Sequence, residues 1–138
     1  MVPLVCIGEK ERPSPGSDKG LADAMRFVTE QVSEVLAVLA EDLPGPSTNY
    51  NVVFAYEPIW AIGAKEPAGK EHVCAVVRGM KGPVRRTGWR GDVRWLYGGS
   101  AGPGVWEGLK EQCDGLFLGR FAHEPERFLD VIKEVRGS

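Results

Sequence analysis

The strongest constraint on the fold is the regular alternation of short apolar runs with longer amphipathic stretches. Each apolar run is followed by a stretch whose apolar residues recur at three- and four-residue steps, which is typical of a helix. Runs that are apolar at nearly every position suit strands that are covered on both faces. The order therefore predicts an α/β protein with a parallel sheet and right-handed crossovers. The predicted strands are residues 3–8, 52–56, 93–97 and 116–119.

Four helices are expected between and after these strands. They are a long one starting at Leu21 and ended by Pro44 to Ser47, one from Ala68 to Met80, a short one around Val105 to Gln112, and a last one from Glu124 to Val135. Gly82 to Gly91 is interpreted as a basic connector. The last helix is expected to turn one apolar side inward, made of Phe128, Leu129, Ile132 and Val135.

Composition narrows the class of protein. A chain of 138 residues with 43% hydrophobic residues is long enough for one domain with a core. A net charge of −2 gives no sign of nucleic-acid or membrane binding. Three widely spaced cysteines do not suggest a disulfide framework or a zinc site, and no metal or cofactor is expected. Without a secretory signal or a membrane span, we expect a cytoplasmic protein.

Each predicted strand ends in a polar or glycine-rich signature. These are Gly8-Glu9-Lys10, Glu57-Pro58, Gly98-Gly99-Ser100 and Gly119-Arg120. Pro58 prevents the second strand from continuing, which leaves the Glu57 carboxylate at the tip. In parallel α/β sheets and barrels, ligand sites lie at this edge.

Four segments together resemble the C-terminal half of triosephosphate isomerase. They are Cys6-Ile7-Gly8-Glu9, Ala55-Tyr56-Glu57-Pro58-Ile59-Trp60-Ala61-Ile62-Gly63, Tyr97-Gly98-Gly99-Ser100 and Asp114-Gly115-Leu116-Phe117-Leu118-Gly119. By this resemblance residues 1–138 are the last four βα units of an eight-stranded barrel, with no second domain. Such barrels take about 250 residues, so the half that carries the family's substrate-binding lysine and electrophilic histidine is absent from this sequence.

The resemblance implies an aldose–ketose isomerase of glycolysis and gluconeogenesis. The family interconverts dihydroxyacetone phosphate and glyceraldehyde 3-phosphate through an enediolate, and Glu57 matches its catalytic base. One carboxylate on one face can take a proton from one carbon and return it to the next. Without this context, Glu57 would be interpreted as a cap or an ion-pair partner at a strand end.

The resemblance also predicts a lid over the site, from Pro58 to Ala68. Trp60 and Ile62 would cover the ligand, and Tyr97 would hydrogen-bond the closed lid. The sequence departs from the family after Gly63, where Ala64-Lys65-Glu66 replaces Thr-Gly-Lys and Pro67 enters the second hinge. The alternative is an ordinary βα loop with a packed tryptophan.

Phosphate binding is expected from backbone N–H groups near the third and fourth strand ends. The matched residues are Gly63, Gly98, Gly99, Ser100, Gly119 and Arg120. Arg120 replaces a family glycine, and its guanidinium would pair with phosphate or with a polar substrate end, or project into solvent. Phe117 replaces an aliphatic residue beside the base, which would change the pocket.

The remaining polar residues are given supporting roles. Glu9 and Lys10 are expected to brace the lid side or the neighbouring strand. Neither His72 nor His123 matches the family's electrophile, and Cys6 is expected in the core.

Three functions remain open. The first is triosephosphate isomerase, the second is a related isomerase of another sugar phosphate such as erythrulose phosphate, and the third is a non-catalytic half-barrel. We expect the isolated chain to be inactive and to self-associate or to bind an N-terminal half.

Overall fold

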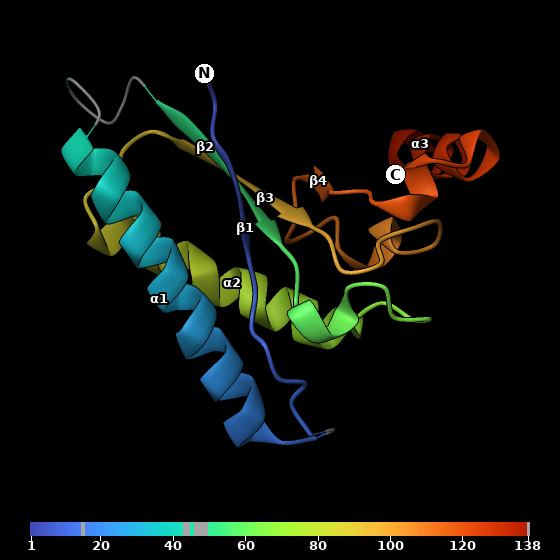
Figure 1. Cartoon of the computed structure of the whole chain (residues 1–138), viewed down its shortest axis with the longest axis horizontal. Helices are drawn as coiled ribbons and strands as arrows, with labels where there is room; N and C mark the ends of the chain where they lie inside the picture. Colours follow the sequence, from blue (N-terminus) through green and yellow to red (C-terminus); the bar gives the residue numbers. More distant parts are fainter. Residues whose placement is uncertain (15, 43–44, 46–49, 138) are drawn as a thin grey trace.

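The computed structural model describes residues 1–14, 16–42, 45 and 50–137 and contains one four-stranded parallel sheet (Figure 1). Its strands are β1 (Leu4–Ile7), β2 (Asn51–Tyr56), β3 (Asp92–Tyr97) and β4 (Gly115–Leu116), in the order β1-β2-β3-β4. This confirms the predicted α/β class. β4 is shorter than expected, although the Phe117 N–H still donates to the Tyr97 carbonyl at 2.8 Å.

Three α-helices and three short 3₁₀ turns connect and follow the strands. The helices are α1 (Asp18–Asp42), α2 (Lys70–Arg86) and α3 (Pro125–Gly137), and the turns are η2 (Ile59–Ala61), η3 (Trp106–Gly108) and η4 (Arg120–Ala122). The predicted helix around Val105 to Gln112 is wrong, since only η3 forms there. The predicted end of the first helix, Pro44 to Ser47, lies outside the described residues except for Gly45.

The second helix continues past its predicted end at Met80. The basic connector expected from Gly82 is therefore wrong up to Arg86, and Pro83 lies inside α2. The apolar spacing explains this, because Val84 follows Met80 at a four-residue step and packs against the core. That packing outweighs the backbone hydrogen bond which a proline removes.

One face of the sheet is covered by α1 and α2. Phe54 and Trp95 stack in this layer, with ring centroids 5.2 Å apart. Each fully buried side chain of this kind contributes about 1.5–3 kcal/mol. The fully buried core residues include Val28, Val32 and Leu36 of α1, Val73, Val76 and Val77 of α2, and Val52, Phe54, Tyr56 and Tyr97 of the strands.

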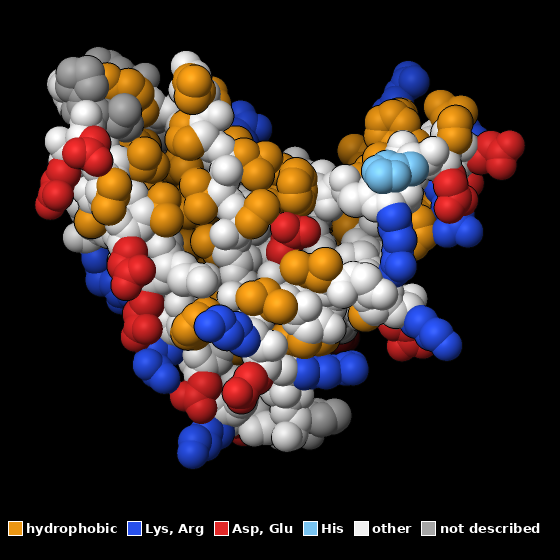
Figure 2. Space-filling view, in the orientation of Figure 1, with side chains coloured by type: hydrophobic (Ala, Val, Ile, Leu, Met, Phe, Trp, Pro, Cys, Tyr) orange, Lys and Arg blue, Asp and Glu red, His pale blue; other side chains and the backbone are white. Residues whose placement is uncertain are grey.

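The opposite face of the sheet is open in this chain. Leu4 is 47% exposed, Cys6 is also exposed, and Val53 and Leu96 are only half-buried. The prediction that both faces are covered is therefore wrong for this chain, and so is the placement of Cys6 in the core. In Figure 2, hydrophobic side chains gather along the sheet, and a broad notch separates them from the part that carries α3. Strands this apolar suit a second layer, which the described residues do not supply.

The last helix lies beyond β4, away from α1 and α2 (Figure 1). It packs on η3 and η4, and Glu134 accepts a hydrogen bond from the Gly104 N–H at 2.7 Å. Only Val131 of α3 is buried. The expected inward side is 36–52% exposed, at Phe128, Leu129, Ile132 and Val135. None of the described helices is both long and apolar enough to cross a membrane.

Candidate active site

The Glu57 carboxylate is carried on a backbone that is paired on both sides. The Glu57 N–H donates to the Ile7 carbonyl at 2.7 Å, and the Gly98 N–H donates to the Tyr56 carbonyl at 2.8 Å. The ends of β1, β2 and β3 therefore meet at Glu57. A residue held this way has little freedom to move relative to the neighbouring strand tips.

Two glycines make the space that Glu57 occupies. A Cβ atom on Gly8 would lie 2.0 Å from the Glu57 carbonyl oxygen, and one on Gly98 would lie 2.3 Å from Glu57 Cγ. Both distances are far below van der Waals contact. Gly98 was predicted only as a phosphate-binding residue, and the structure adds this packing role.

Cys6 is a titratable neighbour of Glu57 on the open face. Although the residue is exposed, partial burial of its thiol, followed by the hydrogen bond and the negative charge of Glu57, raises the pKa of Cys6. Side chains alternate along a strand, so Cys6, Ala55 and Glu57 lie on the same face through the register Cys6↔Ala55. The half-buried carboxylate is therefore directed to the side of the sheet that this chain leaves open.

The predicted lid, residues 58–68, is fastened to the loop after β3. The Ser100 hydroxyl lies 2.9 Å from the Ala61 carbonyl and 3.1 Å from the Ala64 carbonyl. The Ala68 N–H donates to the Tyr97 hydroxyl at 3.0 Å, so the expected hydrogen bond between Tyr97 and this segment is present. The Tyr97 hydroxyl in turn donates to the Gly99 carbonyl at 3.0 Å. Burial raises the pKa of Tyr97 to about 12, which keeps it a donor.

The backbone of the loop after β3 is unusual at two residues. Gly99 has φ of 71°, which glycine adopts without cost, but Ser100 has φ of 68°. A non-glycine residue in this region costs of order 1–3 kcal/mol. The two lid carbonyls near its hydroxyl help to compensate for that strain. Gly63 also has a positive φ, of 73°, and lies exposed in the lid.

Arg120, the first residue of η4, contacts the predicted lid. Its Nη2 atom lies 2.6 Å from the Ala64 carbonyl and 3.4 Å from the Ser100 hydroxyl. The sequence suggested that Arg120 pairs with phosphate, pairs with a polar substrate end or projects into solvent, and none of these anticipated a bond to the predicted lid. Gly119 before it is exposed, and Phe117 is half-buried.

A buried acidic cluster holds the other end of the lid. Glu9 is only 4% exposed and accepts hydrogen bonds from Trp60 Nε1 at 2.9 Å and from the Tyr56 hydroxyl at 3.0 Å. Its Oε1 also lies 2.9 Å from His72 Nε2. Burial alone would raise the pKa of Glu9, but hydrogen bonds from His72, its own backbone, Trp60 and Tyr56 lower it below the usual range.

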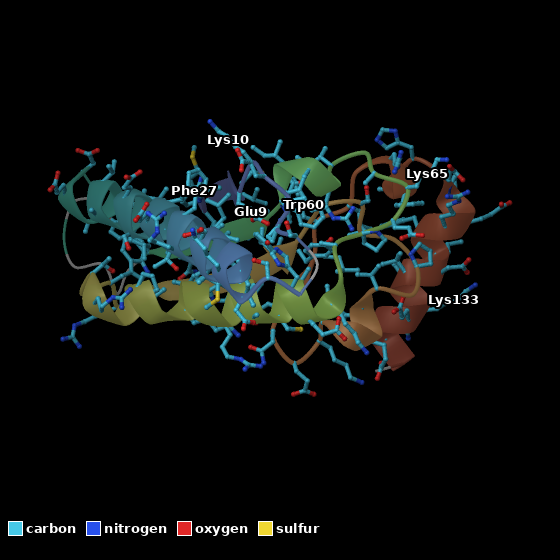
Figure 3. All side chains as sticks on the ribbon, turned by 90° about the horizontal axis from the view of Figure 1, so that it is seen from below. Glu9, Lys10, Phe27, Trp60, Lys65 and Lys133 are labelled. Carbon is cyan, nitrogen blue, oxygen red and sulfur yellow. The ribbon has the colours of Figure 1, made fainter. Side chains whose placement is uncertain are left out.

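Glu9 thus contacts both expected neighbours, the predicted lid through Trp60 and the adjacent strand through Tyr56, but the sequence did not identify His72 as a partner. Trp60 lies beside Glu9 in Figure 3, and its ring meets the His72 ring edge-on at 5.6 Å. A buried tyrosine hydroxyl usually has a partner, which was the available signal for Tyr56. Lys10 is exposed and takes no part. That Trp60 and Ile62 cover a ligand stays a prediction, and the Ile62 side chain is 56% exposed.

A cavity of about 550 Å³ lies away from Glu57, between the segment after β1 and the start of α1. Its lining includes side chains of both charges, among them Lys10, Arg12 and Asp23, and the aromatic side chain of Phe27. Within the described ranges, no group of three His, Cys, Asp or Glu residues could hold a metal ion.

Comparison with known proteins gives consistent matches. The family profile described as triosephosphate isomerase matches residues 1–135. The chain is 35% identical over 135 residues to L-erythrulose-1-phosphate isomerase of Pectobacterium atrosepticum, covering 98% of this chain and 48% of that protein. It is 34% identical over 145 residues to triosephosphate isomerase of Rubrobacter xylanophilus, covering 99% and 52%. A probable triosephosphate isomerase 2 of Listeria monocytogenes is 33% identical, with 98% and 50% covered. The chain thus spans about half the length of these relatives.

Proposed function

Because this chain belongs to the triosephosphate isomerase family, we propose that it supplies the base, the lid and part of the phosphate site of a sugar-phosphate isomerase. The observation that carries the proposal is the placement of Glu57. It lies at a strand tip between Gly8 and Gly98, where a Cβ atom on either glycine would collide with Glu57. The segment 58–68 that follows it is held at both ends, by Glu9 and by Tyr97.

In the proposed reaction, Glu57 removes a proton from the carbon beside the substrate carbonyl. The electrons of that C–H bond form the enediolate. A proton then passes from the hydroxyl oxygen on that carbon to the former carbonyl oxygen, and Glu57 returns its own proton to the neighbouring carbon. The carbonyl needs a hydrogen-bond donor or a positive charge to stabilise the developing oxyanion. His72 is bonded to Glu9, and His123 is exposed, so we propose that this donor comes from another polypeptide segment.

The phosphate group of the substrate would bind on the lid side of Glu57. We assign it to the backbone N–H groups of Gly99, Ser100 and Gly119, with Gly63, Gly98 and Arg120 around them. The positive φ values of Gly99 and Ser100 bend the chain into a loop whose N–H groups can converge on an anion. Phe117 follows the last strand and would line the same side.

The substrate proposed first is a triose phosphate, dihydroxyacetone phosphate or glyceraldehyde 3-phosphate, in glycolysis and gluconeogenesis. The second candidate is erythrulose phosphate. It is supported by the similarity to an L-erythrulose-1-phosphate isomerase and by the bulky Phe117 and charged Arg120 beside the site. The three cysteines are unpaired, which suits a reducing cytoplasm.

We further propose that the site is complete only when a second half-barrel covers the open face. The outer edges of β1 and β4 have no neighbouring strand among the described residues. Unpaired edges and an apolar face favour association. A polypeptide with the other four βα units, or a second copy of this chain, would satisfy both.

The test is turnover by the 138-residue chain, alone and mixed with the N-terminal half of the Rubrobacter relative. Both triose and erythrulose phosphates are supplied, and Glu57→Gln is the matched control. We expect no turnover alone and turnover in the mixture, reduced about 10²–10⁴-fold by Glu57→Gln. Turnover by the chain alone, at a concentration where sedimentation shows a monomer, would refute the need for a second half. Equal turnover by both variants in the mixture would refute the role of Glu57.

A further inference from the structure

We propose that Arg120 is a positioning residue that clasps the lid to the loop after β3 and couples lid closure to phosphate binding. The clasp follows from the contacts of this chain. The coupling to phosphate rests on the proposed function.

The clasp joins three segments that are far apart in the chain. Arg120 Nη2 lies 2.6 Å from the Ala64 carbonyl of the lid and 3.4 Å from the Ser100 hydroxyl. Ser100 itself lies within 3.1 Å of the same Ala64 carbonyl. The lid carbonyl is thus shared by donors from the ends of β3 and β4. Figure 3 shows Lys65, the next lid residue, near the end of the molecule that carries α3.

The guanidinium is held in place by contacts within this chain. Its Cζ atom lies 5.6 Å from the centroid of the Phe121 ring, which suits a cation–π contact. The Phe121 ring packs closely on Gly102, where a Cβ atom would lie only 2.8 Å from the ring. This contact limits the movement of Phe121. Arg127 lies 5.3 Å from the same ring centroid. Phe121 therefore ties Arg120 to the segment that follows Ser100.

Arg120 keeps donors and charge for an anion. A guanidinium carries five N–H donors in a fixed planar fork, and both contacts use Nη2 alone. Among the described residues, the ion pairs do not include Arg120, whereas Arg127 pairs with Glu124 at 2.7 Å. A phosphate dianion bound to the N–H groups of Gly99 and Ser100 would thus lie close to the positive charge of Arg120. The same guanidinium already donates a hydrogen bond to the lid. Binding and closure are then linked through one side chain.

Amide hydrogen exchange of the 138-residue chain tests the clasp without any need for turnover. Arg120→Ala is compared with Arg127→Ala, which removes the other arginine on the Phe121 ring but no lid contact. We expect the lid amides of Ile62, Ala64 and Ala68 to exchange about 3- to 10-fold faster in Arg120→Ala, as the loss of one typical hydrogen bond at an exposed site implies. Arg127→Ala should leave them unchanged.

Amides of α1 and α2 report in the same experiment whether each variant is folded. If Arg120→Ala loses that protection, Arg120→Lys replaces it, since it keeps the charge and loses the fork. Unchanged lid exchange in a folded Arg120 variant would overturn the proposal, and so would equal acceleration by Arg127→Ala.

The coupling is tested by adding inorganic phosphate. We expect phosphate to slow lid exchange in the wild type and Arg127→Ala but not in Arg120→Gln, which keeps an amide donor and loses the charge. No response in the wild type, or an equal response in Arg120→Gln, would overturn the coupling. If lid exchange follows these expectations but the mixture of the two halves shows no turnover, the isomerase function is rejected. The contacts proposed for Arg120 would still be supported.

Discussion

The two faces of the sheet differ sharply, although the strands are apolar toward both. On the covered face, α1 and α2 bury Leu36, Phe54 and Met80 to 1% exposure or less. On the open face, Leu4 and Cys6 remain exposed. α3 resembles the open face, since Leu129 is 52% exposed. The comparison shows that the stability of this chain comes from the layer between the sheet and the helices α1 and α2. The opposite face of the sheet is apolar and uncovered, which is typical of a surface that another polypeptide covers.

The largest expected effect comes from breaking the covered layer. Leu36→Ala should lower the free energy of unfolding by about 2–5 kcal/mol, because it leaves a cavity among fully buried side chains. The matched change on α3, Leu129→Ala, should stay within about 0.5 kcal/mol. Urea unfolding followed by far-UV circular dichroism measures both. Equal losses would mean that the α3 side is packed as tightly as the core.

The second prediction concerns the ends of the strands, where Gly8 and Gly98 pack against Glu57. Gly8→Ala should cost about 1–3 kcal/mol, because its Cβ atom would lie 2.0 Å from the rigid Glu57 carbonyl. Gly82→Ala in α2 meets no atom within 4 Å, so it should instead stabilise the chain by up to about 1 kcal/mol. The same unfolding assay applies, and opposite signs are the expected outcome. A neutral Gly8→Ala would show that the tips can move apart.

The smallest effect is a pH dependence at the Glu9 cluster. The folded-state pKa of Glu9 lies below its usual value of 4.5, so its ionised form stabilises the fold above that pH. This contribution is lost as the pH falls through the lowered pKa. Glu9→Gln should cost about 0.5–1.5 kcal/mol at pH 7, and the difference from the wild type should shrink below pH 4.5. Unfolding at a series of pH values checks this, and a constant difference would contradict it.

The sequence predicted the covered layer well because its signals are local. The spacing of Val28, Val32 and Leu36 indicates the helix face that is buried, and the apolar run from Val52 indicates the central strand. Glu57 and Tyr97 were found from short motifs at strand ends. The resemblance supplied their expected roles, which the sequence pattern alone does not give.

The errors arose where distant segments or a missing layer decide the outcome. Cys6 and α3 were placed in a core because apolar patterns do not reveal whether their covering layer is present. The Arg120 contact with Ala64 joins residues 56 positions apart. His72 on Glu9 joins residues 63 positions apart. No periodicity connects such positions, so only the folded backbone brings them together.

The central claim is that the open face is the surface which another half-barrel covers, and Cys6 reports on it directly. Alkylation of the chain by iodoacetamide is followed by mass spectrometry at each cysteine, with and without the N-terminal half of the Rubrobacter relative. Cys6 is exposed beside Glu57 and its pKa is raised, so at alkaline pH we expect it to react in the dilute chain and to become protected in the mixture, while Cys74 changes little. Equal alkylation of Cys6 in both samples, with the two halves shown to be bound, would contradict it.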